Sequence, residues 1–277
     1  MNNHGQNKEK NMIPLGYDEC PICKGSGYEI IKKKCPEVYN DDTEVEFAIP
    51  CTRCNGAIQK RSEEFRQRAN IPVSFYDADM TKFNRDIYRK ADGTSIDISK
   101  QMKVIDSFIE EFEKWDKEGM GLYIYSNMKG SGKTFLASCI CNTLIEKHPM
   151  TTKFVSASNL LELSKQGSDG KYATVYDKDP IELLCNCKLL VIDDLGQKTN
   201  GLGWLQDILF RITDARMQQK LVTIYTSNIQ MCNLEFDDRI VDRINRTCTQ
   251  ISLPEYCVRS KEGNEIKRQF LADLGLV

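Results

Sequence analysis

Residues 121–147 constrain the fold of this chain more than any other stretch. They open with the apolar and aromatic run GLYIYS, continue through a loop that ends in Gly132, Lys133 and Thr134, and then place apolar side chains at helical spacing. A strand, a glycine-containing loop and a helix in this order bring main-chain amides and a helix N-terminus to one point, where they bind phosphate groups. The sequence therefore predicts a phosphate-binding loop inside an α/β fold.

The loop departs from the common pattern G-x-x-x-x-G-K-[ST] at its first position, where Asn127 replaces glycine. Asparagine adopts positive φ more readily than most other residues, so we expect the loop to accept it. Lys133 is expected to reach the β- and γ-phosphates of a nucleoside triphosphate, and Thr134 to ligate Mg²⁺. A chance match to a short motif is the alternative. The predicted nucleotide contacts in the loop are Asn127, Lys129, Gly130, Ser131, Gly132, Lys133 and Thr134.

Strand candidates alternate with helical stretches along the chain. They lie at residues 121–126, 152–157, 188–195 and 221–228. Strands that alternate with helices form parallel sheets covered on both faces, so we expect a parallel β-sheet flanked by helices. Ahead of the sheet, residues 57–71 and 95–121 carry apolar side chains at helical spacing, and each is expected to form one helix.

Two adjacent carboxylates end the third of these strands, KLLVIDDL. Buried strands seldom end in adjacent acidic residues unless a cation meets them. We expect Asp193 to hold Mg²⁺ through water as part of the nucleotide site, and Asp194 to polarise the water that attacks the nucleotide. The alternative is a strand that runs out into a polar turn at Leu195 and Gly196.

Two C-x-x-C pairs, CPICKGSG and CTRCNG, lie between residues 20 and 56. Four thiolates in this pattern form a tetrahedral Zn²⁺ site, and the metal supplies folding energy to a segment with few apolar residues. We predict structural zinc at Cys20, Cys23, Cys51 and Cys54. A redox pair and an iron–sulfur cluster are the weaker alternatives, and Cys35 is a possible substitute ligand. The remaining cysteines are expected to be neutral thiols.

Composition bounds the cellular setting and the domain organisation. Twelve cysteines behind a polar N-terminus favour thiols and metal over disulfides, and no apolar run reaches the roughly 18 residues of a membrane span. We expect a cytoplasmic protein with no membrane partner. A net charge of −2 means that a local patch must bind any nucleic acid. Residues 1–16 are predicted to be a disordered tail, 17–70 a zinc-binding module with a linker helix, and 71–277 the phosphate-binding domain.

Three further motifs follow the double aspartate in order. They are TIYTSN at 223–228, DDRIVDRI at 237–244 and CVRSKEGNEIKRQFL at 257–271. Together with the phosphate loop they resemble the DnaC/DnaI/IstB group of AAA+ ATPases, which are bacterial and phage replicative-helicase loaders and transposition helpers. The resemblance covers residues 57–273, and ANIPVSFYDADMTKF at 69–83 looks like the lead-in of that family. It implies an AAA+ P-loop NTPase core, with a parallel β-sheet flanked by helices, beside a small N-terminal zinc-binding module that docks on the helicase.

The resemblance also implies roles for single residues. Asn228 looks like the sensor-one residue, which positions the hydrolytic water. Arg243 looks like the arginine finger offered to the nucleotide of a neighbouring subunit, with Arg239 as the rival. Arg259 looks like the sensor-two arginine, which contacts the γ-phosphate within the same subunit. A guanidinium suits these tasks because it presents a fixed fork of donors, although ordinary ion pairs are the alternative for all these arginines. With Lys133 and Asp194, the catalytic candidates are Asn228, Arg243 and Arg259.

On this resemblance we expect an ATP-dependent helicase loader that binds the replicative hexameric helicase and single-stranded DNA during initiation of DNA replication. Its cofactors would be ATP, Mg²⁺ and Zn²⁺, and a finger supplied in trans implies a homo-oligomer. The alternatives are an IstB-type transposition helper ATPase and a zinc-dependent adaptor that binds ATP without hydrolysing it. Lys198, Thr199 and Trp204 are candidate DNA contacts, but for Trp204 we favour packing at the start of the next helix.

Overall fold

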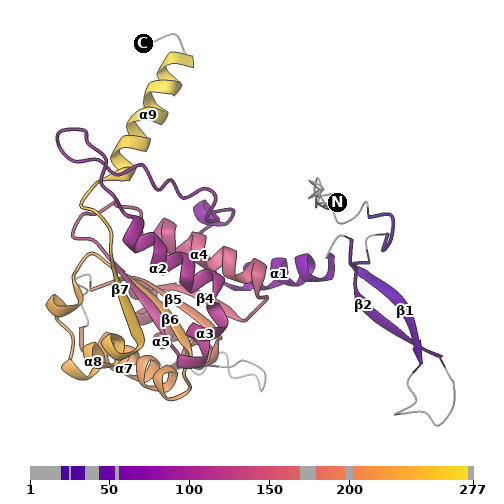
Figure 1. The fold of residues 1–277 in the computed structure, drawn as a ribbon. Coiled ribbons are helices and arrows are strands. Elements are labelled where there is room, and N and C mark those ends of the chain that lie inside the picture. The colour runs from indigo at the N-terminus through magenta and orange to yellow at the C-terminus, as the bar shows by residue number, and fades with distance from the viewer. Residues whose placement is uncertain are drawn as a thin grey trace, which may run out of the picture. The chain divides into compact units, whose positions relative to one another are not determined.

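The computed structural model describes residues 20–24, 26–34, 44–53, 56–168, 179–196 and 202–273. The chain divides into two compact units, residues 1–64 and 65–277, each of which is described by itself (Figure 1). The division falls inside helix α1 (Gly56–Arg68), the helix expected from residues 57–71. Among the described residues, no helix combines the length and the apolar character that crossing a membrane requires.

The first unit contains one antiparallel hairpin. Strand β1 (Tyr28–Lys34) pairs with β2 (Glu44–Pro50), and the main-chain N–H of Cys51 donates to the oxygen of Gly27 at 2.8 Å. Ile30, Ile31 and Phe47 on this hairpin are exposed. A two-stranded hairpin with open faces has little core of its own, so the buried cysteines beside it are the obvious means of holding the unit together.

The second unit is built on a five-stranded sheet with the order β4-β5-β6-β3-β7, in which all neighbours are parallel. Its strands are β3 (Gly121–Tyr125), β4 (Thr152–Ser156), β5 (Leu189–Leu195), β6 (Val222–Ser227) and β7 (Cys248–Ser252). The predicted parallel sheet and its strands are confirmed, whereas β7 was not predicted. Because the strands are parallel, the residues that follow β3, β5 and β6 meet at one edge of the sheet.

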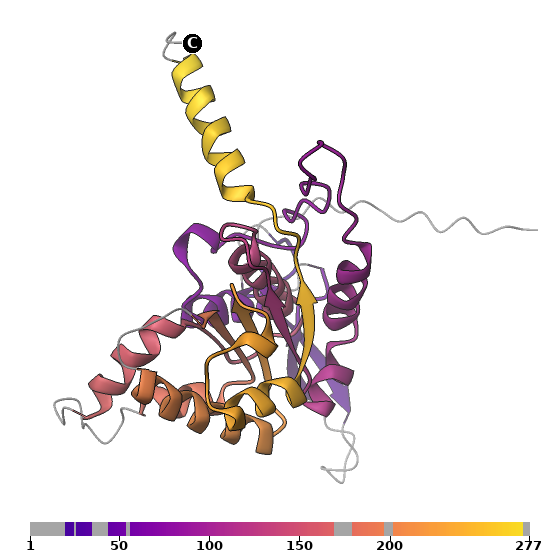
Figure 2. The ribbon, with the colours of Figure 1, turned by 90° about the vertical axis from the view of Figure 1, so that its left-hand side faces the viewer.

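Helices cover both faces of the sheet, and each face has its own apolar core (Figures 1 and 2). Leu122 and Ile124 point into one core and Tyr123 into the other, as the two-residue period of a strand requires. The first core packs α2 (Ser99–Glu110), α3 (Phe112–Glu118) and α4 (Lys133–Lys147). The second packs α5 (Ala157–Ser168), α6 (Pro180–Asn186), α7 (Leu202–Gln218) and α8 (Asp238–Thr247).

The single helix expected at residues 95–121 is wrong. The segment forms α2 and α3, separated at Glu111, whose φ of −114° and ψ of 30° leave the helical region. The break turns the chain so that Phe112 and Trp115 both pack edge-on against Phe108, with ring centroids 5.6 and 5.3 Å apart. Tertiary packing of three aromatic rings therefore overrides a continuous helical pattern.

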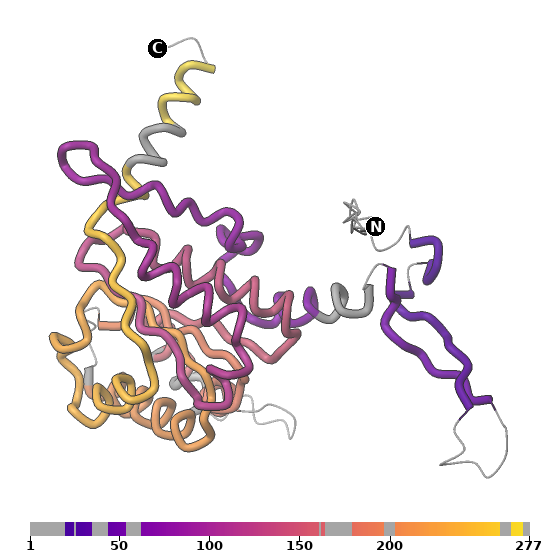
Figure 3. The backbone as a smooth tube through the Cα atoms, viewed as in Figure 1, coloured from indigo at the N-terminus to yellow at the C-terminus, as the bar shows by residue number. Residues whose placement is uncertain are grey.

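A lead-in segment, residues 69–98, precedes these helices and carries the short turn η2 (Val73–Phe75). Figure 3 follows it from α1 past α4 to the start of α9 (Val258–Asp273). Helix α9 projects away from the sheet in both ribbon views (Figures 1 and 2). A second short turn, η3 (Met231–Asn233), links β6 to α8.

Candidate nucleotide-binding site

The phosphate-binding loop connects β3 to α4 at the carboxyl edge of the sheet. Gly130 and Gly132 have φ values of 76° and 92°, in the left-handed region that favours glycine. A Cβ on Gly130 would lie 3.0 Å from Cys257 Sγ, so the loop also needs a small residue there. The main-chain oxygen of Gly132 accepts from Leu136 at 2.8 Å and begins the helix, whose N-terminus faces the loop.

Lys133 is buried beneath this loop. Its Nζ donates to the main-chain oxygens of Met128 at 3.0 Å and Ser126 at 3.3 Å, and to Ser131 Oγ at 3.1 Å. Burial lowers the pKa of Lys133, and the nearby carboxylates of Asp194 and Asp193 oppose that shift. The ammonium is therefore held by neutral acceptors of its own loop, which phosphate oxygens can replace with stronger charged contacts.

Thr134 and Asp193 form a compact set of oxygen ligands. Thr134 Oγ1 lies 3.0 and 3.2 Å from the two carboxylate oxygens of Asp193, and the Thr226 hydroxyl also donates to Asp193. Burial raises the pKa of Asp193, and the hydrogen bonds from the hydroxyl groups of Thr226 and Thr134 oppose this shift. A hydroxyl and a partly desolvated carboxylate are hard oxygen donors of the kind that Mg²⁺ prefers, so these residues fit the predicted ion.

Asp194 adopts an unusual backbone conformation for an aspartate. Its φ is 57°, and the register between β5 and β6 shifts between Ile192 and Leu195. Its N–H donates to Thr226 Oγ1 at 3.0 Å, and Asn228 Nδ2 donates to its Oδ1 at 3.2 Å. A bulge at a strand end re-aims one side chain, and strain of this kind gathers at functional sites. The side chains of Asp193 and Asp194 thereby face different partners, although both residues bond to Thr226 Oγ1.

Lys133, Thr134 and Asp194 line a cavity of about 380 Å³, and Asp193 is not part of that lining. Its lining includes the predicted residues Lys129, Gly130, Ser131, Gly132, Lys133, Thr134, Asp194, Asn228 and Arg259. Arg259 is the second residue of α9, and its main-chain N–H donates to the oxygen of Gly130 at 3.2 Å. The structure thus brings residues from the ends of β3, β5 and β6 together with the start of α9.

Four lining residues, Ser74, Phe75, Phe135 and Val258, were missed by the sequence reasoning. Phe75 and Phe135 pack edge to face with centroids 5.6 Å apart and give the cavity an apolar side. The only signal for Ser74 and Phe75 was the position of the lead-in ahead of the core. Nothing in the local sequence indicated that it folds back over the phosphate loop.

Asn127 does not line the cavity, and its expected positive φ is wrong. Its side chain instead donates to Glu255 Oε1 at 2.7 Å, in the segment that leads to α9. The loop reaches its conformation through left-handed Gly130 and Gly132, so the first position needs no special backbone freedom.

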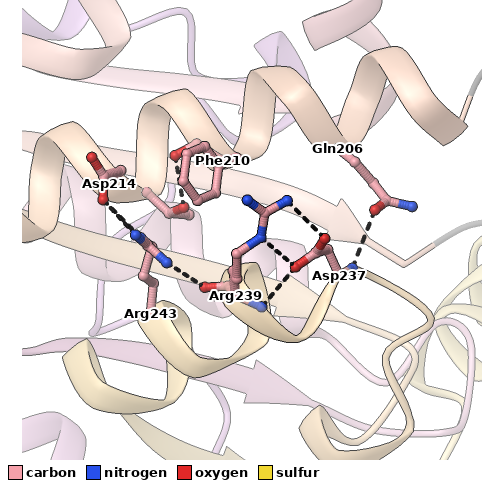
Figure 4. Close-up of polar contacts among 7 residues, drawn as sticks. Gln206, Phe210, Asp214, Asp237, Arg239 and Arg243 are labelled. Carbon is pink, nitrogen blue, oxygen red and sulfur yellow. Dashed lines mark hydrogen bonds and ion pairs between the residues drawn. The ribbon is translucent and has the colours of Figure 1, made fainter.

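The arginines expected to act on a neighbouring nucleotide lie on α8, outside the cavity (Figure 4). Arg243 Nε and Nη2 donate to Asp214 Oδ1 at 2.9 and 2.7 Å, and its side chain is 19% exposed. Arg239 pairs with Asp237 and is 68% exposed. Both guanidinium groups lie over the ring of Phe210, at 4.5 Å for Arg243 and 5.0 Å for Arg239. Arg239 is the more accessible arginine, and Arg243 is the more firmly oriented one.

Three of the four predicted zinc ligands form a buried cluster. The sulfur atoms of Cys20, Cys23 and Cys51 lie within 4.8 Å of one another, and those of Cys20 and Cys51 are 3.8 Å apart. Cys54, the fourth predicted ligand, lies outside the described residues. The main-chain N–H of Lys24 donates to the oxygen of Cys20 at 2.8 Å, which closes a tight turn around the first pair. Three convergent thiols with a fourth in the sequence fit tetrahedral zinc.

Trp204 corrects another expectation. It lies in the first turn of α7 and is 70% exposed, so the expected packing at the start of this helix is wrong. Lys198 and Thr199 lie outside the described residues. Cys139, Cys141, Cys185, Cys187 and Cys248 are buried, as expected of neutral core thiols.

The fold and the site together define an AAA+ P-loop protein that binds ATP. A family model described as IstB-like ATP binding protein matches residues 123–265, which is more than half of the chain. The chain belongs to this family of IstB-like ATP-binding proteins.

Its relatives include proteins named as helicase loaders. Replicative helicase loader DnaC of Buchnera aphidicola subsp. Schizaphis graminum is 30% identical over 148 residues, which cover 52% of this chain and 57% of that protein. Replicative helicase loader DnaI of Bacillus subtilis is 28% identical over 125 residues, which cover 45% of this chain and 38% of that protein. The match therefore spans about two fifths to three fifths of these relatives.

Among solved structures, the crystal structure of the DnaC helicase loader is similar in fold, with a TM-score of 0.54. The alignment has 18% sequence identity and covers 66% of this chain and 99% of that one. At this identity the likeness shows the fold, which is that of a DnaC-like AAA+ core.

Proposed function

We propose that this protein is an ATP-hydrolysing helicase loader that acts on the replicative helicase and single-stranded DNA during initiation of replication. The observation that carries the ATPase part is the convergence of Lys133, Thr134, Asp194 and Asn228 on one cavity, with Asp193 bonded to Thr134 behind it. The relatives named as helicase loaders support the biological role.

The chemistry of the site follows from its charges. Mg²⁺, held by Thr134 and Asp193, would neutralise charge on the β- and γ-phosphates. Lys133 would exchange its loop acceptors for phosphate oxygens. Asp194 would accept a proton from the attacking water, and Asn228, bonded to Asp194 at 3.2 Å, would keep that carboxylate oriented. Arg259 would contact the γ-phosphate from the start of α9 and link its presence to that helix.

We propose that hydrolysis is completed between subunits. Arg243, or its neighbour Arg239, would supply positive charge to the nucleotide of an adjacent copy, which makes the active form a homo-oligomer. A guanidinium oriented by Asp214 and Phe210 is suited to this because less side-chain freedom is lost when it meets phosphate.

The N-terminal unit is proposed to bind zinc through Cys20, Cys23, Cys51 and Cys54 and to dock on the helicase. The exposed apolar side chains of Ile30, Ile31 and Phe47 on its hairpin are suitable for such a contact. We also propose that exposed Trp204 stacks on single-stranded DNA bases.

Two experiments test this function. Steady-state phosphate release should require ATP and Mg²⁺ and should be lost in Lys133→Ala and Asp194→Asn. Pull-down of the replicative helicase from the same genome should depend on the cysteine unit, with Cys232→Ser, an exposed thiol in the other unit, as the matched control.

The outcomes separate the alternatives. ATP binding without phosphate release would favour the non-hydrolysing adaptor. ATPase activity that responds to a transposase and not to a helicase would favour the IstB-type helper.

A further inference from the structure

The nucleotide cavity has an apolar part besides its phosphate-binding loop. Residues 129–134 supply the loop, and Phe75, Phe135 and Val258 add apolar surface to the same cavity. A purine ring suits such a mixed lining because its faces are apolar and its edge is polar. The position of Phe75 therefore bears on how well the base, as distinct from the phosphates, is held.

The turn that carries Phe75 is short and is only weakly stabilised by its own contacts. The 3-10 turn η2 spans only Val73–Phe75, no side chain caps it, and its first residue, Val73, is 92% exposed. Its main chain is closed by hydrogen bonds of 3-10 type, such as that from Phe75 N–H to the oxygen of Pro72 at 2.8 Å, and the geometry of such bonds is poorer than in an α-helix. The position of Phe75 in the cavity lining therefore depends on contacts between this turn and other parts of the fold.

Asn142 on α4 supplies that support. Its Nδ2 lies 3.1 Å from the oxygen of Phe75, 3.1 Å from that of Tyr76 and 2.7 Å from that of Ala78. The orientation of the amide is fixed by chemistry, since the opposite one would set Oδ1 against carbonyl oxygens. We propose that Asn142 is a positioning residue, which holds the base-side wall of the cavity against the helix that begins at the phosphate loop.

Burying an asparagine at position 142 costs stability, and this cost supports its assignment as a positioning residue. Asn142 is 3% exposed, and within the described residues its Oδ1 has no hydrogen-bond partner. Asparagine is also a poorer helix former than alanine or leucine. An apolar residue would avoid both penalties, so the donors of the amide are what this position contributes. The hydroxyl of Thr143 accepts from Met80 at 3.3 Å and continues the same attachment.

The inference rests on the proposed ATP site and predicts a change in ligand preference. Without the Asn142 amide, the segment carrying Phe75 loses its hydrogen bonds to α4, while the contacts of residues 129–134 are unchanged. Asn142→Ala should weaken ATP binding by about tenfold, the effect of losing roughly one buried hydrogen bond's free energy. Binding of inorganic tripolyphosphate, which has no base, should change less than about twofold.

Isothermal titration calorimetry with Mg²⁺ and each ligand in turn measures both effects on the full chain. Ser138→Ala is the matched control, because it removes another buried polar group from α4, one whose hydrogen bond among the described residues stays within the helix, to the oxygen of Thr134. It should leave the ratio of the two Kd values unchanged. Equal weakening of both ligands in Asn142→Ala, or no weakening of either, overturns the proposal.

A second variant guards against a folding defect. Asn142→Ser keeps a single donor and should give an intermediate ratio. Hydrogen exchange followed by mass spectrometry should rise in residues 73–80 of both Asn142 variants, and unchanged exchange there also overturns the proposal. If the unaltered protein binds tripolyphosphate but not ATP, the proposed ATP site itself fails, which is a different result from an unchanged ratio in the variants.

Discussion

Arg243 and Asp214 form an ion pair between α8 and α7, with 2.7 Å between Nη2 and Oδ1. Both side chains are mostly buried, and the ring of Phe210 lies against the Arg243 guanidinium, 4.5 Å from its centroid (Figure 4). If Arg243 contacts the nucleotide of a neighbouring subunit, its guanidinium has to give up its bonds to Asp214 for bonds to phosphate, or make both at once. This relationship connects the catalytic proposal to subunit assembly.

Arg243→Ala should therefore reduce ATP hydrolysis by about 10³-fold, the lower range for arginine fingers, while ATP binding by the isolated subunit is retained. Arg239→Ala is the matched comparison, because the Arg239 side chain contacts the same Phe210 ring but is exposed, and its ion pair is with the nearby Asp237. Mixing Arg243→Ala subunits with Lys133→Ala subunits should restore part of the activity, since one copy keeps the loop and the other keeps the arginine. If only Arg239→Ala loses ATP hydrolysis, Arg239 is the arginine finger. If neither variant loses it, α8 carries no arginine finger.

Asp193→Asn should make the nucleotide-free protein more stable while it abolishes Mg²⁺-dependent hydrolysis. Burial raises the pKa of Asp193, so the ionised carboxylate destabilises the folded state, and increasingly so as the pH rises through the folded pKa. We expect the melting temperature of the variant to rise by roughly 2–4 °C, the shift that about 1 kcal/mol gives in a domain of this size.

Thermal unfolding in a chelator, in mildly acidic and in neutral buffer, measures this effect. The gain over the unaltered protein should be smaller in the acidic buffer, because protonation there already removes the buried charge. Asp242→Asn is the control. Asp242 forms an exposed ion pair with Arg246, so this substitution should change the melting temperature little. A lower melting temperature for Asp193→Asn in neutral buffer would contradict the prediction.

Tyr88→Phe should weaken ATP and tripolyphosphate alike. The Tyr88 hydroxyl is fully buried and donates to the main-chain oxygen of Ser131 in the phosphate loop at 3.0 Å. Phenylalanine keeps the ring contact with Tyr256 but leaves that oxygen without its donor, which should cost about tenfold in affinity. Titration calorimetry with both ligands is the measurement. Tyr123→Phe removes a comparable buried hydroxyl bond, to the oxygen of Ile229, and should leave both affinities unchanged.

Zinc should be present in the purified protein in equimolar amount and should be lost in Cys51→Ser. The sulfur of Cys51 is fully buried among those of Cys20 and Cys23, so a hydroxyl there leaves the metal with a poor ligand. Elemental analysis of the full chain gives the metal content, with Cys232→Ser as the control. Protein from zinc-supplemented cultures that contains no metal would count against the site.

Sequence spacing was enough to locate the chemistry of the phosphate side. Lys133 and Thr134 are adjacent to their glycines, and Asp193 and Asp194 end a strand, so local order already fixes their relation to the loop and the sheet edge. The same holds for the Cys20 and Cys23 pair, whose spacing within a turn brings both thiols together. These inferences succeed because they depend on contacts between near neighbours along the chain.

The sequence by itself determined the α/β class, four of the five strands of the parallel sheet and the groups that can meet phosphate. Only the tertiary structure decided that β6 lies between β3 and β5, which sets Asn228 beside Asp194. It also decided that Asn127 bonds to Glu255 and that Asn142 anchors the wall carrying Phe75. The physical reason is the same in each case. Such contacts join residues far apart in the chain, and they form only when the sheet order and the packing of the lead-in on α4 are in place.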